Sequence, residues 1–417
     1  MRRTLSFALV ASLFMIAGSA FADVHITMLN TKGEIQAQLE DAAAAFSAEN
    51  PGITLEIQAT PVGQSPFQAL SALYASGNAP ALAMLDGSDI PLFAEKFLDL
   101  KGEKWIKDST ADFGPVKVDG AVLAYPLTVE GYGFIYNKAV LAKAGVDPTK
   151  IHTTKELDAA FRKVEASGAG ALVIGPMDWS LGAHFLGIAY SLTGKDQEGL
   201  LKLCAGLKAG KVDVSRQKAF VGVLDTFDVM KKHNVRKADA LAVTYDDCPA
   251  LIGPGKVGFY FQGNWNWPQI AGFASDKEGF GFIPVPISNN PSDLGNSSIV
   301  AGPSKWVGID KTQNSPEQQA AARKFLDWLV YSKTGQAAVV DKMNLIPAFK
   351  NNPLPLKDPL AKSIAAYLAQ GKTLFSVSIP APDHWSKVGA SMQKYLVDKI
   401  DRKALYKEIQ DYWKTVK

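Results

Sequence analysis

The amino-acid sequence predicts an α/β fold of two lobes that meet at a cleft. The chain has 417 residues, which is more than a single hydrophobic core usually serves, since cores stop growing beyond roughly 250 to 300 residues. Its first segments alternate between strand and helix patterns. The stretch Tyr125–Lys138 then carries two apolar runs around an acidic and aromatic centre. We interpret this stretch as a hinge that joins the lobes and contributes side chains to the cleft.

The first strand, helix and strand define the sheet. Residues 24–29 form an apolar run that is typical of a buried strand. A helical spacing of apolar residues follows over 35–46, and Asn50-Pro51-Gly52 ends it. Residues 53, 55 and 57 are apolar in alternation and predict a second strand. A strand-helix-strand unit of this kind predicts a parallel sheet with a right-handed crossover.

Two further elements extend this sheet. We expect a helix at about 66–75 and a strand over 81–85. Asp86 and Asp89 come directly after that strand. Because open parallel sheets place ligand contacts beyond the carboxyl ends of their strands, these two acids are candidate ligand contacts.

The predicted hinge is preceded by a hairpin. Residues 116–123 alternate around Asp119-Gly120, the strongest short hairpin signal. In the hinge itself, Pro126 is expected to break the first apolar run, and Glu130 and Tyr132 follow it.

Beyond Lys138 the pattern predicts further elements: a helix at 154–166, a strand at 171–174, helices to about 233, strands at 257–261, 280–285 and 298–309, a capped helix from 315, and closing helices at 385–396 and 405–416.

The amino terminus is typical of a secretory signal peptide. Arg2 and Arg3 precede an apolar run over 5–17, and Gly18–Ala22 supplies small residues before a cleavage site after Ala22. The alternative, a membrane helix, is disfavoured because the run falls short of the roughly 20 apolar residues that span a bilayer. No cysteine follows the cleavage site, so we expect a soluble periplasmic protein without a lipid anchor.

Composition narrows the function classes. Lys and Arg number 44 against 41 Asp and Glu, a formal net charge of +3. This near balance gives no sign of a nucleic-acid partner, and we expect a monomer. Cys204 and Cys248 are too few for a disulfide-built scaffold, although one bond between them stays open in an oxidising compartment.

Motifs of enzymes are absent from the sequence. Gly255-Lys256-Val257 and Gly371-Lys372-Thr373 both lack the remainder of a phosphate-binding loop. The chain has no G-x-S-x-G, no H-E-x-x-H and no C-x-x-C, and its five His residues are scattered. The sequence therefore predicts no catalytic residue, no metal site and no cofactor.

Predicted loops instead combine tryptophan with acid, amide or imidazole. The pairs are Asp178-Trp179, Asn264-Trp265 and His384-Trp385. Aromatic rings cover the apolar faces of sugars, while polar neighbours bind the hydroxyl groups. The alternative is that each Trp belongs to a core, and that is the interpretation we favour for the tryptophans within helix or strand patterns, namely Trp105, Trp306, Trp328 and Trp413.

Arginine placement favours a neutral ligand. Carboxylates and phosphates are usually bound by paired contacts from Arg. None of the arginines after the predicted cleavage site lies in a candidate loop; they are Arg162, Arg216, Arg236, Arg323 and Arg402.

These residues resemble a known family. The pattern Tyr-Pro-x-x-Val-Glu-x-x-x-x-Ile-Tyr-Asn-Lys at Tyr125–Lys138 resembles the first interlobe crossing of the maltose-binding-protein-like family, the extracellular solute-binding proteins of carbohydrate ABC transporters. Other segments match in order along the chain: 30–33, 263–265, 316–335 and 382–385.

The resemblance implies a class II periplasmic-binding-protein-like fold of two discontinuous lobes. Each lobe has a mostly parallel sheet flanked by helices, and a sugar binds between them. The implied N-terminal lobe is 23–129 with 285–345, and the C-terminal lobe is 130–284 with 346–417. The implied partners are a carbohydrate and the membrane permease subunits of the transporter.

The resemblance also assigns roles. Lys32 matches a hydroxyl-binding loop, although Thr31 replaces the family's acid there; Glu130 matches a hinge carboxylate, and Trp265 and Trp385 match stacking platforms. The loop around Trp179 and the segment 194–218 do not align clearly. The full candidate set is Lys32, Glu34, Gln64, Asp86, Asp89, Glu130, Tyr132, Asp178, Trp179, Asn264, Trp265, His384 and Trp385.

The expected mechanism is capture of a sugar by hinge-bending closure. Alternatives are a carbohydrate-active enzyme that uses Glu130 with Asp86 as its acid pair, the same fold binding a polyamine, phosphodiester or peptide, and a purely structural exported protein.

Overall fold

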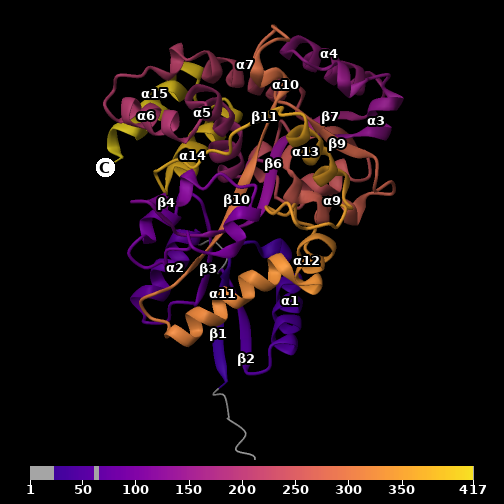
Figure 1. Ribbon diagram of the computed structural model, residues 1–417. Helices are drawn as coiled ribbons and strands as arrows, with labels where there is room; N and C mark the ends of the chain where they lie inside the picture. Colours follow the sequence, from indigo (N-terminus) through magenta and orange to yellow (C-terminus); the bar gives the residue numbers. More distant parts are fainter. Residues whose placement is uncertain (1–22, 61–64, 417) are drawn as a thin grey trace, which may run out of the picture.

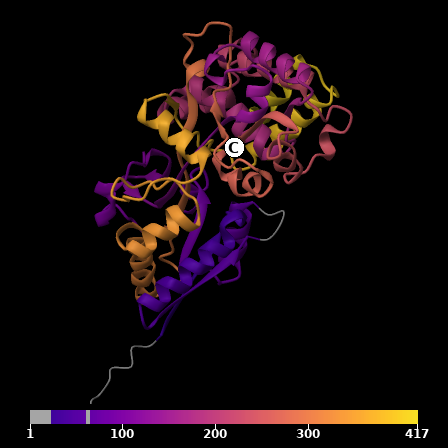
Figure 2. The same cartoon turned by 90° about the vertical axis from the view of Figure 1, so that its right-hand side faces the viewer.

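The computed structural model describes residues 23–60 and 65–416 and has two bodies joined by long strands (Figure 1). The lower body in Figure 1 holds β1, β2, α1 and α11, and the upper body holds α4, α7 and α15. Figure 2 shows the same division from the side. The predicted signal peptide, residues 1–22, lies outside the described residues. Among the described helices, none combines the length and apolar character that crossing a bilayer requires.

The predicted strand-helix-strand unit is confirmed in the lower lobe. Strand β1 (Val24–Asn30), helix α1 (Gln36–Glu49) and strand β2 (Ile53–Ala59) follow in order, and the two strands pair in parallel. Helix α2 (Pro66–Ala75) leads to β3 (Leu82–Asp86), which pairs in parallel with the other edge of β1. Asp86 thus ends a strand at the carboxyl edge of a parallel sheet, as predicted.

The hairpin before the hinge is also confirmed. Strands β4 (Lys117–Val118) and β5 (Ala121–Val122) pair across Asp119-Gly120. Both turn residues have positive φ, 48° and 83°, which is the conformation that a tight two-residue hairpin turn needs.

The hinge stretch is one continuous strand. Strand β6 (Tyr125–Asn137) pairs antiparallel with β10 (Ile299–Ile309), and both run from the lower body into the upper one (Figure 1). The expectation that Pro126 breaks the run is therefore wrong. Pro126 lies opposite Trp306, beside a register shift between Lys305 and Trp306. At such an irregularity the missing N–H of a proline removes no regular ladder bond.

The crossing strands merge the sheets of both lobes. The strand order is β2-β1-β3-β10-β6-β8-β7, with β9 also on β6 and β11 on β10. Strand β7 (Gly170–Val173) pairs in parallel with β8 (Val257–Gly263), while β8 and β9 (Phe280–Ile283) are antiparallel to β6. Strand β11 (Thr373–Leu374) is short. Parallel pairs thus flank a central antiparallel crossing.

Helices cover this sheet in both lobes. Helix α11 begins with the predicted capping box, since Ser315 Oγ accepts from the Gln318 N–H and the Ser315 N–H donates to Gln318 Oε1 at 2.9 Å. The bounds of the remaining helices are α3 Lys138–Lys143, α4 Thr154–Ala166, α5 Leu186–Gly194, α6 Gln197–Lys208, α7 Lys218–His233, α8 Asp247–Ile252, α9 Trp267–Phe273, α10 Leu294–Ser297, α11 Pro316–Tyr331, α12 Lys333–Ala337, α13 Pro359–Ala369, α14 His384–Leu396 and α15 Arg402–Thr415.

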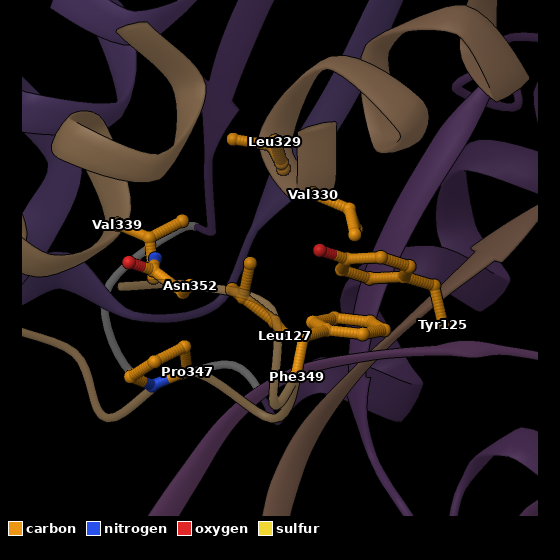
Figure 3. A pocket seen from close by; sticks show the side chains of 8 residues that line it. All are labelled: Tyr125, Leu127, Leu329, Val330, Val339, Pro347, Phe349 and Asn352. Atoms are coloured by element: carbon orange, nitrogen blue, oxygen red, sulfur yellow. The ribbon is translucent and has the colours of Figure 1, made fainter. Parts of the chain in front are cut away.

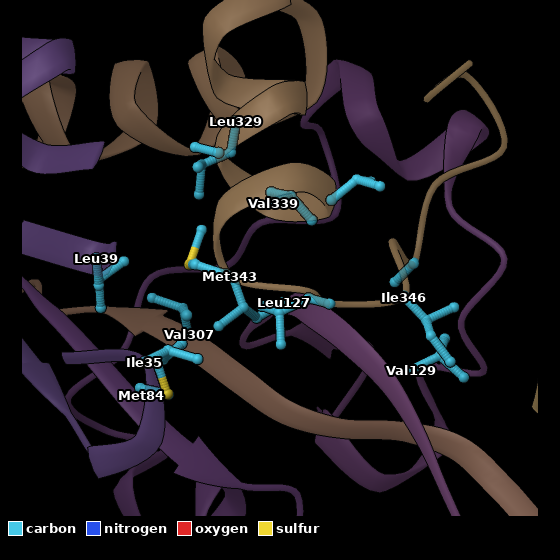
Figure 4. Close-up of a cluster of buried hydrophobic side chains, with 14 of the residues drawn as sticks. Ile35, Leu39, Met84, Leu127, Val129, Val307, Leu329, Val339, Met343 and Ile346 are labelled. Carbon is cyan, nitrogen blue, oxygen red and sulfur yellow. The ribbon is translucent and has the colours of Figure 1, made fainter. Parts of the chain in front are cut away.

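One apolar cluster fills the lower lobe and continues through the crossing to residues of β6, β8 and β9, and a second fills the upper lobe. In the lower lobe Leu39, Met84, Leu127 and Val307 gather from α1, β3, β6 and β10 (Figure 4). The ring of Phe46 packs edge-on against Phe325 at 5.2 Å between centroids. The tryptophans predicted to be core are all buried, namely Trp105, Trp306, Trp328 and Trp413. The core prediction for these four residues is therefore confirmed.

The cysteines do not pair. Cys204 lies in α6 and Cys248 in α8, and both are buried free thiols. Burial raises the pKa of each thiol to about 12. The two cysteines therefore form no disulfide and act as packing residues.

The Phe46→Ala variant tests the lower core. Phe46 is 0% exposed, and removing a buried phenyl ring typically costs about 3 to 5 kcal/mol. We expect urea unfolding followed by circular dichroism to show a loss of that size. The matched control is Phe273→Ala, because Phe273 is 51% exposed and should change stability by about 0.5 kcal/mol or less. Equal losses in both variants would contradict the packing described.

Candidate functional site

A buried ion-pair network lies where the lobes join. Lys32, in the loop after β1, donates from Nζ to Glu34 Oε1 and to Glu130 Oε1, both at 2.6 Å. Lys32 is 3% exposed and Glu130 is 7% exposed. The hydroxyl of Ser304 on β10 donates to Glu130 Oε2. The β1 loop and both crossing strands are therefore joined through one carboxylate.

Electrostatics favour the charged form of this pair. Burial acts to lower the pKa of Lys32, but the carboxylates of Glu130 and Glu34 outweigh it and raise that pKa well above its ordinary value. Burial acts to raise the pKa of Glu130, yet Lys32 and the Ser304 hydroxyl hold it below its ordinary value. Glu130 therefore remains ionised at neutral pH, with both oxygens engaged.

Local backbone structure positions these groups. The Asn30 side chain accepts from the Lys32 N–H at 2.9 Å and donates to the Lys32 carbonyl at 3.0 Å, which fixes the turn after β1. On β10 the register with β6 shifts between Pro303 and Lys305. Ser304 lies in that irregularity, and its side chain reaches Glu130, whose register partner is Gly302. A regular ladder would instead have assigned Ser304 its own partner on β6.

A second charged group follows β3. Lys305 Nζ donates to Asp86 Oδ1. Asp89 is 6% exposed, and burial together with the nearby Asp86 carboxylate raises its pKa to about 7, although Lys305 acts in the opposite direction. Such a raised carboxyl pKa is common at functional sites.

Aromatic side chains of the upper lobe form the other wall. We use the name aromatic group for Tyr132, Trp179, His184, Tyr245 and Trp265. His184 is central, with ring centroids 4.8 Å from Trp265, 4.9 Å from Tyr132 and 5.5 Å from Trp179. Trp179 lies 5.7 Å from Tyr245. Trp179, Tyr245 and Trp265 are only partly buried, so part of each side chain stays accessible.

The charged groups and the aromatic group influence each other across the crossing. Burial lowers the pKa of His184 to about 4, while Glu130 and Asp86 oppose this shift. Burial raises the pKa of Tyr245, and Glu34 raises it further. Charges of the lower lobe therefore act on rings of the upper lobe. This arrangement defines the candidate ligand site.

Most candidates from the sequence lie at this site. The structure brings together Lys32, Glu34, Asp86, Asp89, Glu130, Tyr132, Trp179 and Trp265. Asp178 adjoins Trp179 and accepts its N–H at 2.8 Å. Asn264 is buried and accepts the Gly131 N–H at 2.9 Å, so it anchors the loop that carries Trp265 to β6. Gln64 lies outside the described residues.

His384 and Trp385 make no ring contact with the aromatic group, although the Trp385 carbonyl lies against Gly182 in the segment that carries His184. His384 is buried in the upper core, where its Nε2 lies 2.9 Å from the Tyr190 hydroxyl, and burial lowers its pKa to about 3. His384 begins α14, next to the start of the predicted closing helix at 385–396, and its ring packs against Tyr190 and Trp413. Trp385 is partly buried and forms no ring contact with another described residue.

Sequence reasoning missed several residues of the site. His184 lies in a π-helical segment, Ser180–Phe185, and Tyr245 lies in a turn before α8. Neither carries a motif. The positions of Ser304 and Lys305 depend on the irregularity in β10, which no local sequence pattern predicts. Asn266 follows Trp265 and is fully buried. Its side-chain amide makes no hydrogen bond of normal geometry to a described residue, although Tyr245 lies close by.

Two other hollows in the structure are poor candidates for a ligand site. A cavity of about 10 Å³ lies among Tyr125, Leu127 and Phe349 of the lower core (Figure 3) and has the size of a single water. A groove of about 650 Å³ in the upper lobe includes Lys231 and Arg402. These two cations are ion-paired with acids of the groove. No cluster of His, Cys, Asp and Glu suited to a metal ion occurs in the described ranges.

Comparison with known proteins assigns the class. Residues 41–402 match the family of bacterial extracellular solute-binding proteins, and the chain belongs to that family. An uncharacterized ABC transporter extracellular-binding protein of Pyrococcus horikoshii is 26% identical over 292 residues, which are 69% of this chain and 60% of that protein. The chain thus matches only 60% of the length of that relative.

Solved structures share the fold. A chitin oligosaccharide binding protein superposes with a TM-score of 0.76 at 20% identity, over 94% of this chain and 99% of its own. RafE in complex with raffinose gives 0.77 at 17% identity, with the same coverage. Maltose-bound MalE3 of T. maritima gives 0.74 at 21% identity, over 94% and 99%. The predicted solute-binding fold is therefore confirmed.

The Lys32→Met variant tests the buried network. Removing the ammonium leaves Glu130 buried and unpaired, which typically costs about 3 to 5 kcal/mol. Adding Glu130→Gln to the same chain should restore about 1 to 3 kcal/mol, because the uncompensated charge is gone. Denaturant unfolding measures both values. Lys101→Met is the control, since its side chain is 67% exposed and surface pairs contribute about 1 kcal/mol or less.

Acid titration gives a second test of the same pair. The pKa of Glu130 is lowered from its ordinary value of 4.5. Its contribution to stability is therefore present above pH 4.5 and is lost as the pH falls through the lower folded value. Below pH 4.5 we expect the wild type to lose more stability than the Lys32→Met/Glu130→Gln variant. Parallel losses would contradict the assignment.

Proposed function

We propose that this chain is the substrate-binding component of an ABC importer and captures a neutral sugar or oligosaccharide. The observation that carries the proposal is the aromatic group facing an acid-lysine network across the strand crossing. Rings cover apolar sugar faces, and carboxylates accept hydrogen bonds from hydroxyl groups. Family membership supports the importer role, and the raffinose and maltose complexes of structural neighbours support the ligand class.

Closure of the lobes is the proposed mechanism. We divide the chain into 23–129 with 285–345 and 130–284 with 346–417. The β6 crossing at Val129 and Glu130 supports the first boundary. The register of β10 places Gly302 opposite Glu130, and Phe349 packs on Trp105 and Tyr125 of the lower lobe, so the second and third crossings lie later in the chain than 285 and 346. A sugar that contacts both lobes stabilises the closed form through its differential affinity. The closed complex then docks on the permease subunits.

Location and assembly follow from the same proposal. Arg2, Arg3 and the apolar run that follows support export to the periplasm by a cleaved signal peptide. The protein then acts as a monomer between solute and permease.

The occupied state of the acids argues for binding instead of catalysis. A glycosidase acid needs a carboxyl group free to protonate or attack the sugar. Both oxygens of Glu130 are engaged by Lys32 and Ser304, and Asp86 is paired with Lys305. Glu130 and Asp86 therefore do not form the free acid pair that the enzyme alternative requires.

A thermal-shift screen over mono- to tetrasaccharides tests the function. A saccharide at about 100 times its dissociation constant should stabilise the protein by about 2.7 kcal/mol. Chromatography of the recovered saccharide should find it intact. A charged solute that shifts the protein while no saccharide does would overturn the proposal, and saccharide cleavage would favour an enzyme.

The Trp265→Ala variant tests the aromatic group. Loss of the ring should weaken saccharide binding by about tenfold to a hundredfold, or about 1.4 to 2.8 kcal/mol. Isothermal titration calorimetry measures the change. Tyr331→Ala is the control, because Tyr331 is an exposed aromatic residue of α11, outside the site. If Trp265→Ala binds as tightly as this control, Trp265 is not a contact.

A further inference from the structure

Charges around the candidate site do not cancel. Its carboxylates outnumber its ammonium groups: Glu34, Asp86, Asp89 and Glu130 stand against Lys32 and Lys305. Both cations are already committed, Lys32 to Glu34 and Glu130 and Lys305 to Asp86. A ligand with negative charge would therefore find no free cation among these groups.

Asp89 is the carboxylate left without a partner. It is 6% exposed, and its carboxylate has neither a hydrogen bond nor an ion pair with any described residue. A buried carboxylate of this kind is costly unless a donor or a cation reaches it. The loop after β3 thus presents a carboxyl group that can accept a donor or a cation from a ligand.

The aromatic group adds no positive charge. His184 is uncharged at neutral pH because burial lowers its pKa to about 4. The faces of aromatic rings attract cations, most strongly those of Trp. Arginines of the described chain are ion-paired elsewhere, as Arg162 with Asp158, Arg216 with Asp213, Arg236 with Asp239, Arg323 with Glu103 and Arg402 with Asp225.

We propose that the site selects an amine-bearing saccharide over its neutral counterpart, and the neutral one over a uronic acid, with Asp89 as the counter-charge of the amine. This inference rests on the sugar-binding function proposed above and names its ligand class more closely. An ammonium group would neutralise the excess carboxylate. A uronate would add a charge of the same sign as the excess.

Proton linkage gives this selectivity a pH dependence. Burial and Asp86 raise the pKa of Asp89 to about 7. A bound ammonium favours the ionised carboxylate, so binding near neutral pH releases a proton. Affinity for the amine should therefore rise with pH through 7, up to the pH at which the ligand amine itself deprotonates.

The experiment compares β-1,4-linked disaccharides that differ in charge. Calorimetry measures cellobiose, the glucosamine disaccharide, its N-acetylated form chitobiose, and cellobiouronic acid. We expect the glucosamine disaccharide to bind about tenfold more tightly than cellobiose at low salt, and cellobiouronic acid to bind most weakly. Equal affinities, or a preference for the uronic acid, would overturn the inference.

Two variants test whether Asp89 causes the charge selectivity. Asp89→Asn keeps the shape of the side chain and should bring the ratio of glucosamine-disaccharide to cellobiose affinity close to one. Glu95→Gln removes the same charge from an exposed position in the same lobe and should leave the ratio unchanged. Circular dichroism melting checks that both variants fold. A ratio that survives Asp89→Asn would remove Asp89 from the account.

The outcomes separate this inference from the proposed function. If cellobiose and chitobiose bind and the charged forms show no preference, the charge selectivity is wrong and sugar binding stands. If none of the four disaccharides binds, the charge selectivity is likewise wrong, and the saccharide screen decides on sugar binding independently.

Discussion

The antiparallel pairing of β6 with β10, fastened by the buried contacts of Glu130, is the constraint on which the structure depends. Both strands run through both lobes, so the sheets of the lobes are continuous across the crossing. A buried ion pair is stable only when its geometry is good and its remaining oxygen is satisfied. Lys32 and Ser304 meet both conditions for Glu130. The same carboxylate therefore holds the hinge strands together and sets the charge of the site.

The two walls of the site differ in chemistry. The lower lobe contributes charged groups at the ends of β1 and β3, where parallel strands deliver their loops. The upper lobe contributes rings that pack on one another around His184. Neither wall alone surrounds a solute with both apolar and polar contacts. This division explains how a ligand could be bound more tightly by the closed protein than by either lobe alone.

Local sequence patterns predicted local structure well. Helix α4 has the predicted bounds, and the Asp119-Gly120 hairpin and the Ser315 cap occur as expected. Each depends on residues a few positions apart. The missed features join distant segments: Glu130 meets Ser304 174 positions away, and His184 reaches Trp265 through tertiary packing. The continuity of β6 through Pro126 is also non-local, since the tolerance of proline there depends on the register of β10. His384 was expected at the site from its neighbour, but neighbouring residues on a helix face different directions.

Small-angle X-ray scattering can follow closure of the lobes around a saccharide, about the β6 and β10 crossings. The protein is measured alone and with the saccharide that gives the largest thermal shift. Closure of the lobes should give a smaller radius of gyration with the saccharide at saturation. An unchanged radius of gyration with calorimetry confirming full occupancy would contradict hinge-bending capture.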